Sequence, residues 1–171
     1  ARDRWGNTFA RLRRGDSPRC VAFVAHTDHP GFVVQETDGK RVRLTFEGNV
    51  RDEYFKDGAI RLFRSGDDRG IPAKIAAMGE YSKSGHNRHG EAIAEEDASG
   101  TLFGMWDLAP VDVQGDRLAS RAVDDIAGCA MVLQALEAAA ERDGDVDFLA
   151  VFTRSEENGF RGALLIGEDP E

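Results

Sequence analysis

The sequence has 171 residues, of which 41% are hydrophobic and 31% charged, and its formal net charge is −9 at pH 7. This apolar content argues against a disordered chain and suits one globular domain, or one domain with a small insert. The negative net charge argues against a surface that binds nucleic acid or an anionic membrane. No apolar run reaches the roughly 20 residues that a bilayer-spanning helix needs, and no signal peptide is visible, so we expect a cytoplasmic protein.

The first part of the chain predicts a buried strand that ends in polar residues. Gly6-Asn7 favours a turn before a short strand. Residues 21–25, VAFVA, form a continuous apolar run and predict a strand buried on both faces. This strand delivers His26 and Asp28 at its carboxyl end, where open α/β sheets place their binding sites.

The middle of the chain has a different residue pattern, which predicts a separate β-rich insert. Short strands are expected in this region, at 32–34, 42–46, 59–63 and 71–77. Asp38-Gly39 favours a hairpin turn between the first two strands. Ser82–Asp97 is polar and is expected to be an exposed loop. No amphipathic helix is recognisable, so we expect a small β-barrel or sandwich inserted into an α/β framework.

The last part of the chain returns to an α/β pattern. An extended apolar stretch, Thr101–Trp106, is followed by a short strand with a turn at Gly115-Asp116. A helix is expected from Asp124 to about residues 142–144. Its buried face is predicted from residues that recur at three- and four-residue steps, namely Ile126, Cys129, Ala130, Leu133 and Leu136. Val146–Thr153 then predicts a second buried strand.

A strand, a helix and a second strand in this order favour a right-handed crossover and a mostly parallel sheet. The expected fold class is therefore α/β, with a first catalytic part over residues 1–30, a β-barrel insert over residues 31–98 and a second catalytic part over residues 99–171. Cys20 and Cys129 lie 109 positions apart, and two reduced thiols are expected rather than a disulfide.

Three pairs of metal-binding side chains stand next to these apolar elements: His26 with Asp28, Asp124 with Asp125, and Glu156 with Glu157. Each pair has an ordinary structural explanation, as a satisfied buried histidine, a helix cap or a solvated loop pair. Together they favour a divalent metal site, since imidazole and carboxylate ligands suit Zn²⁺, Co²⁺ and Mn²⁺. A carboxylate can bridge two such ions, and a neighbouring free glutamate can accept a proton from water.

Three blocks, VAFVAHTDHPGFVV, LASRAVDDIAGCAMVLQAL and VFTRSEENGFRGA, resemble the signature blocks of the glutamyl/tetrahedral aminopeptidase family of dinuclear zinc metallopeptidases. The opening DRWGNTFARLRRG and the segment GTLFGMWDLAP are also similar to their family counterparts. The resemblance covers most of the chain. It implies a zinc-peptidase-like α/β domain interrupted by a β-barrel, two divalent ions per complete site, a peptide substrate and a homo-oligomer.

The resemblance also implies a role for each matching residue. His26 would be a terminal ligand of one metal, Asp124 would bridge both metals, and Glu157 would be a ligand of the other metal. Glu156 would be the general base that deprotonates the attacking water, while Asp28 would accept a hydrogen bond from His26 and fix its tautomer. Asp125 is expected at the helix start or behind the ligands, and not on a metal.

The sequence departs from the family pattern in several places. His29-Pro30 stands where the family usually has an acid and an apolar residue, and Ile126 stands where arginine is usual. The family also has two further ligands, an aspartate and a histidine, beyond the glutamate pair. His86 and His89 lie in the insert, where we expect them to be exposed rather than ligands, unless one reaches substrate in a neighbouring subunit. The resemblance thus places these 171 residues at the N-terminal portion of the family.

The function expected from these observations is metal-dependent removal of N-terminal residues from peptides, with the isolated 171-residue chain weak in metal binding and inactive. One alternative is an amidohydrolase or deacylase of the same clan that cleaves a non-peptide amide. Another alternative is a non-catalytic relative or fragment with a role in assembly. The sequence does not identify the preferred N-terminal residue, the physiological metal or the size of the oligomer.

Overall fold

The computed structural model describes residues 1–168 and divides the chain into two compact units. The sheet unit combines Ala1–His29 with Ala122–Glu171, and the barrel unit is Pro30–Arg121. The barrel unit therefore ends later than the insert end expected at residue 98. The difference arises because the extended stretch that follows residue 98 joins the barrel.

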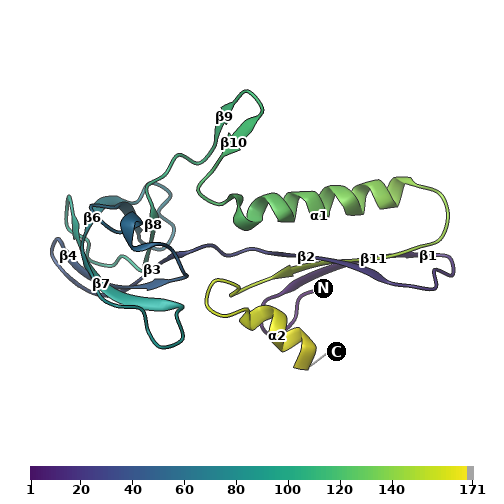
Figure 1. The fold of residues 1–171 in the computed structure, drawn as a ribbon, viewed down its shortest axis with the longest axis horizontal. Helices are drawn as coiled ribbons and strands as arrows, with labels where there is room; N and C mark the ends of the chain where they lie inside the picture. The colour runs from purple at the N-terminus through teal and green to yellow at the C-terminus, as the bar shows by residue number, and fades with distance from the viewer. Residues whose placement is uncertain (169–171) are drawn as a thin grey trace. The chain divides into compact units, whose positions relative to one another are not determined.

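The sheet unit is a mixed α/β layer (Figure 1). Its sheet has the order β1 (Thr8–Arg14), β11 (Val146–Thr153), β2 (Val21–His26). The β11 strand runs parallel to β2, as the strand–helix–strand pattern predicts, but antiparallel to β1. Helix α1 (Val123–Glu141) packs along β2 and β11, and α2 (Arg161–Glu168) follows β11 on the opposite side of the sheet. A mostly parallel sheet is thus only partly supported.

The β2 strand is much less buried than its apolar sequence predicts. Only Ala25 is buried, whereas Val21 and Val24 are 52% and 59% exposed. The reason is that, within residues 1–168, β2 pairs with β11 alone and has no strand on its other side. By contrast, β11 lies between two strands and buries Phe148 and Ala150, as predicted.

Helix α1 presents a partly different face to the sheet from the one expected. Cys129 and Leu136 pack against the core, as predicted, together with the buried Val132. Ile126 and Leu133 are instead 47% and 50% exposed. The helix is apolar around much of its circumference, so residue spacing alone could not decide which side faces the sheet.

The barrel unit contains a closed six-stranded barrel, which confirms the β-barrel predicted for the insert. The strands follow one another around the barrel in the order β3 (Gly31–Asp38), β4 (Arg41–Glu47), β7 (Asn87–Ala94), β6 (Ile71–Met78), β5 (Ala59–Phe63) and β8 (Phe103–Trp106). A short 3-10 helix, η1 (Asp52–Tyr54), joins β4 to β5. Alternate residues point inward, as the period of a strand requires, and fill the interior with Phe32, Val42, Leu44, Phe46, Ile60, Leu62, Ile71 and Ala92.

Two segments of the barrel differ from expectation. Ser82–Asp97 is not wholly an exposed loop, because it contains β7. The inward-facing residues of β7 include Ala92 and the buried Arg88, so the usual alternation of large apolar residues is absent from the sequence. The second difference is β8, which closes the barrel between β3 and β5 rather than joining the sheet unit.

Within the barrel unit, β9 (Asp112–Gln114) and β10 (Arg117–Ala119) form a hairpin around the turn expected at Gly115-Asp116. Gly115 has φ of 62°, a conformation that glycine adopts without strain. In the part of the chain that the structure describes, both cysteines are free thiols and no helix is long and apolar enough to cross a membrane.

Candidate metal-binding active site

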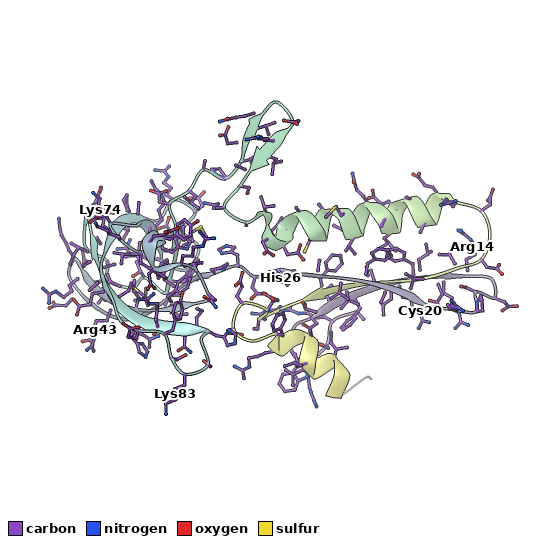
Figure 2. All side chains as sticks on the ribbon, in the orientation of Figure 1. Arg14, Cys20, His26, Arg43, Lys74 and Lys83 are labelled. Atoms are coloured by element: carbon purple, nitrogen blue, oxygen red, sulfur yellow. The ribbon has the colours of Figure 1, made fainter. Side chains whose placement is uncertain are left out.

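The carboxyl ends of two parallel strands bring the predicted site residues together at one edge of the sheet unit. In the parallel pairing, His26 at the end of β2 is opposite Thr153 at the end of β11. The Thr27 amide extends this pairing with a 2.9 Å hydrogen bond to the Thr153 carbonyl oxygen. Figure 2 shows His26 at this end of the sheet and Cys20 near the other end. The exposed thiol of Cys20 is therefore separate from the site.

The imidazole of His26 is held between a backbone carbonyl oxygen on one side and two carboxylates on the other. Its Nδ1 lies 2.9 Å from the backbone oxygen of Asp28, and its Nε2 lies 2.9 Å from Asp124 Oδ1 and 3.7 Å from Glu156 Oε2. A carbonyl oxygen can only accept, so Nδ1 is the donor and Nε2 is the atom that faces the carboxylates. Burial lowers the pKa of His26, but the hydrogen bonds to Asp124 and Asp28 and the nearby negative charges outweigh burial and raise it.

Asp125 supports His26 from behind. Its Oδ2 accepts a 3.1 Å hydrogen bond from the His26 backbone N–H, while Cys129 Sγ donates to the His26 carbonyl oxygen at 3.2 Å. A Cβ at Gly128 would lie 2.0 Å from Asp125 Oδ1, so only glycine leaves room for this carboxylate. Asp124 and Asp125 have non-helical backbone angles, and the regular helix begins after them.

The carboxylate of Asp28 fixes the turn that carries the glutamate pair. Its two oxygens accept hydrogen bonds from the backbone amides of Glu156 and Glu157, each at 3.2 Å. The Asp28 Oδ1 atom lies 3.8 Å from His26 Nδ1, which donates instead to the Asp28 backbone oxygen. Asp28 thus accepts from His26 through its main-chain oxygen and orients the glutamate pair through its side chain.

The site accumulates negative charge around Glu157. Burial and the neighbouring Glu156 carboxylate raise the pKa of Glu157 to about 7. Asp28 and Asp124 add to this effect, and His26 opposes it. A group of carboxylates that must hold a proton near neutral pH is an environment that a divalent cation would stabilise.

The donor set fits a divalent metal in its chemistry. His26, Asp124 and Glu157 offer the imidazole nitrogen and carboxylate oxygens that Zn²⁺ binds in proteins. Asp124 is 88% exposed in its side chain and so can be reached from solvent. Among residues 1–168, however, no group of three or more histidine, cysteine, aspartate or glutamate side chains is arranged to hold a metal ion. These residues therefore offer suitable donors without a preformed ligand shell.

A glutamine at position 157 is expected to alter the pH dependence of stability in the metal-free chain. The pKa of Glu157 is higher in the folded state than its ordinary value of 4.5, so the folded state binds more protons between pH 4.5 and about 7. The native charge therefore destabilises the fold progressively as pH rises through this window. We expect Glu157→Gln to raise the free energy of unfolding by roughly 1 kcal/mol at pH 8, after allowance for partial exposure of the side chain, and to leave it unchanged at pH 4.

Urea unfolding with a chelator at both pH values measures this difference. Glu137→Gln, on the exposed side of α1, is the matched control and should leave the difference between the two pH values unchanged. An equal effect of Glu157→Gln at both pH values would contradict the raised pKa.

Asn7 is a structural support for the site that the sequence did not reveal. Its fully buried side chain accepts a 3.0 Å hydrogen bond from the Arg154 amide and donates to the Gly162 carbonyl oxygen at 3.1 Å. It also donates to Asp3 Oδ2 at 2.7 Å. These bonds hold both ends of the segment that contains the glutamate pair. The sequence predicted only a turn here, because an asparagine after glycine is ordinary turn chemistry.

Replacement of Asn7 by alanine is expected to destabilise the sheet unit by about 2–4 kcal/mol. The change removes three hydrogen bonds and leaves the Arg154 amide and the Gly162 carbonyl without that partner. Asn49→Ala, at an exposed position, should change stability by less than about 0.5 kcal/mol. Thermal unfolding monitored by circular dichroism compares the two variants, and equal melting temperatures would show that Asn7 has no such role.

The histidines of the insert belong to the barrel unit. His89 lies on β7, where its Nδ1 is 2.9 Å from the hydroxyl oxygen of Thr45 on β4. His86 precedes this strand, and its carbonyl oxygen accepts a 2.8 Å hydrogen bond from the Gly48 amide. His89 is thus exposed on a strand rather than on the loop expected for it, and it has a hydrogen-bond partner within the barrel.

Comparison with known proteins matches most of the chain to one family. The model of the M42 glutamyl aminopeptidase family matches residues 6–171. A candidate aminopeptidase of Acetivibrio thermocellus is 27% identical over 169 residues, which are 94% of this chain and 49% of that protein. This chain therefore spans about half the length of the curated relative it matches.

Two solved structures have a similar fold. An aminopeptidase from the archaeon Desulfurococcus kamchatkensis has a TM-score of 0.73 at 22% identity, over 95% of this chain and 48% of that one. The TET1 peptidase of Pyrococcus horikoshii, which can assemble into a tetrahedron or a large octahedral shell, has a TM-score of 0.74 at 17% identity. That match covers 99% of this chain and 55% of the Pyrococcus horikoshii chain.

Proposed function

The chain belongs to the M42 glutamyl aminopeptidase family, and on that premise we propose that it is part of a metal-dependent aminopeptidase. The observation that supports this proposal is the position of His26. Its Nε2 faces the Asp124 carboxylate at 2.9 Å and the Glu156 carboxylate at 3.7 Å, at the edge where two parallel strands end. A base, a bridging carboxylate and an imidazole at one edge are what metal-assisted hydrolysis needs.

In this proposal His26, Asp124 and Glu157 are ligands of a pair of divalent ions, zinc or alternatively cobalt or manganese. The ions, when bound, would supply Lewis acidity and lower the pKa of water. The complete ligand set would need further donors, because the described residues do not form a group of three. We therefore expect the 171-residue chain by itself to bind metal weakly and to lack turnover.

The protein's own contribution to the reaction is proton transfer and positioning. Glu156 accepts the proton of the attacking water and returns it to the leaving amine. Asp28 holds the Glu156 amide at 3.2 Å, so the base is attached to the same strand end as the ligand His26. Asp125 fixes the His26 main chain at 3.1 Å. The base and the imidazole are thus positioned by neighbouring carboxylates.

A substrate panel on the full-length gene product tests the reaction type. We expect hydrolysis of peptides with a free N-terminus, no hydrolysis of the same peptides after N-acetylation, loss of turnover with a chelator, and recovery with zinc, cobalt or manganese. Cleavage of N-acyl amino acids alone would identify a deacylase instead. No turnover on either class, with metal bound, would favour a role in assembly.

We also propose a homo-oligomer with peptide as its substrate. The proposal is supported by the structurally similar Pyrococcus horikoshii peptidase, which can assemble into a tetrahedron or a large octahedral shell. Sedimentation velocity on the full-length gene product would measure the assembled mass, and a monomer at micromolar concentration would contradict this proposal.

A further inference from the structure

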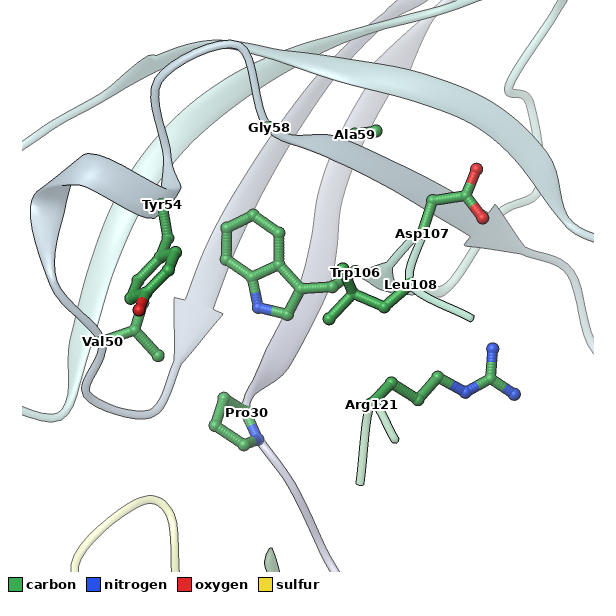
Figure 3. Close-up of a pocket in the computed structure, with 9 residues that line it drawn as sticks. All are labelled: Pro30, Val50, Tyr54, Gly58, Ala59, Trp106, Asp107, Leu108 and Arg121. Carbon is green, nitrogen blue, oxygen red and sulfur yellow. The ribbon is translucent and has the colours of Figure 1, made fainter. Parts of the chain in front are cut away.

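The barrel unit contains a pocket that the proposed metal site does not use (Figure 3). Its volume is about 370 Å³, within the range of small-ligand sites. Most of its lining is apolar or aromatic. The lining includes Val50, Tyr54, Trp106, Asp107, Leu108 and Arg121. All belong to the barrel unit, so the pocket is defined without reference to the sheet unit.

Trp106 forms a fixed wall of this pocket. Its ring packs edge-on against Phe32, with centroids 5.1 Å apart, and lies 5.5 Å from the ring of Phe55. A Cβ at Gly58 would lie 2.8 Å from Trp106 Cζ3, so glycine permits the indole to lie close to the backbone. Figure 3 shows the indole between Tyr54 and Leu108. An aromatic ring held from behind is a preformed surface for a flat or branched apolar group.

The part of the lining that contains Val50 is fixed by a tyrosine outside the pocket. The Tyr81 hydroxyl donates to the Val50 carbonyl oxygen at 2.8 Å and accepts from the Val50 amide at 2.9 Å. These two bonds hold the backbone that follows β4 at the pocket. Ordering of this part of the site on binding would therefore cost little free energy, which favours binding of a small group.

Among residues 1–168, the charged groups that line the pocket include one cation, Arg121, with no hydrogen bond or ion pair. Asp107 is paired with Arg61, whose Nε lies 2.9 Å from Asp107 Oδ1. Arg121 makes no hydrogen bond or ion pair within residues 1–168, and its side chain is exposed beside Leu108 (Figure 3). A guanidinium without a protein partner next to an apolar cavity favours an anionic group attached to an apolar body.

We propose that this pocket binds the C-terminal residue of a peptide, with its apolar or aromatic side chain against Trp106 and its carboxylate on Arg121. The charge complementarity selects a carboxylate, and the aromatic and aliphatic walls select the side chain. The inference does not depend on the proposed metal chemistry, because it concerns recognition of the end of a peptide by the barrel unit alone.

Binding can be measured through the indole N–H signal of Trp106 in two-dimensional NMR of the 171-residue chain, with the Trp5→Phe variant to assign it. The probe is acetyl-Gly-Gly-Phe with a free carboxylate, compared with the same peptide as its C-terminal amide. Both probes are blocked at the N-terminus, so aminopeptidase activity does not enter the result. We expect the acid to shift the Trp106 signal with a Kd of the order of 1 mM, and the amide to bind about tenfold more weakly.

Two variants at the pocket, with one control elsewhere on the barrel unit, locate the site. Arg121→Met should weaken binding of the acid about tenfold and leave binding of the amide unchanged, because it removes the charge and keeps an apolar chain. Arg41→Met, at an exposed position at the start of β4, is the matched control and should leave binding unchanged. Leu108→Glu, at a residue 55% exposed, should abolish binding without loss of the fold.

Several results would overturn the proposal. They are equal binding of acid and amide, an undiminished affinity in Arg121→Met, and no shift of the Trp106 signal by either peptide. Binding of acetyl-phenylalanine without binding of the peptide would exclude a peptide end as the ligand.

Discussion

The Glu156→Gln variant of the full-length gene product is expected to lose about 10³-fold in kcat while its metal content stays unchanged. The substitution keeps the size of the side chain and the Asp28 hydrogen bond to the residue 156 amide, but removes the group that accepts a proton. General-base catalysis by a placed side chain contributes about 10²–10⁴-fold, which sets the size of the expected loss. Steady-state kinetics on an aminoacyl substrate, beside metal analysis of the same sample, measures both quantities.

The contrast with the neighbouring glutamate makes this test specific. Glu157→Gln should lose metal and turnover together, because Glu157 is proposed as a ligand and not as the base. Glu137→Gln, on the exposed surface of α1, should retain both. Full activity in Glu156→Gln would exclude Glu156 as the base, and loss of metal from that variant would make it a ligand instead.

The second large effect is expected at Asp124. The Asp124→Asn variant should weaken metal binding by at least about 100-fold, since a lost ligand costs more than the 10–100-fold typical of an outer partner. It also replaces the carboxylate that lies 2.9 Å from His26 Nε2, so the pKa of His26 should fall toward its ordinary value. Equilibrium dialysis with zinc measures the first change, and NMR titration of the imidazole without metal measures the second.

An unchanged zinc affinity in Asp124→Asn would remove Asp124 from the ligand set. Asp143→Asn provides the control, because Asp143 is exposed beyond the end of α1. The NMR titration separates the two roles. A fall in the pKa of His26 with full retention of zinc would leave Asp124 as a partner of His26 alone.

The sequence predicted the elements that position the site because their signals are local. The apolar run before His26 and the apolar strand Val146–Thr153 are each continuous, and both form strands. Parallel pairing of the two strands follows from the helix between them, and it brings the residues after each strand to one edge. The proximity of His26 to Asp124 and Glu156 could thus be expected from order along the chain.

Other features depend on packing that a linear pattern does not record. The β2 strand reads as buried because every residue is apolar, yet Val24 is 59% exposed where no described strand pairs with β2. The β7 strand is not recognisable from the sequence because a buried arginine replaces an apolar residue on its inner face. Arg88 is stabilised there by the rings of Phe55 and Tyr81, at 4.6 and 4.7 Å.

The support of the site was also beyond sequence reasoning. Asn7 contacts Arg154 and Gly162, about 150 residues away along the chain, and no local signal marks such a pairing. The bonding of Asp28 is a matter of side-chain geometry, since a carboxylate two positions from a histidine could equally contact the ring or the neighbouring turn. In the structure the Asp28 carboxylate accepts from the Glu156 amide at 3.2 Å. The His26 ring donates instead to the Asp28 backbone oxygen.

The most direct test of the account is metal content together with aminopeptidase turnover, measured on the full-length gene product and on the 171-residue chain. We expect two divalent ions per chain and turnover in the longer protein, with weak metal binding and no turnover in the shorter one. Tight binding of two metals by the 171-residue chain, or no turnover in a metal-loaded longer protein, would contradict it.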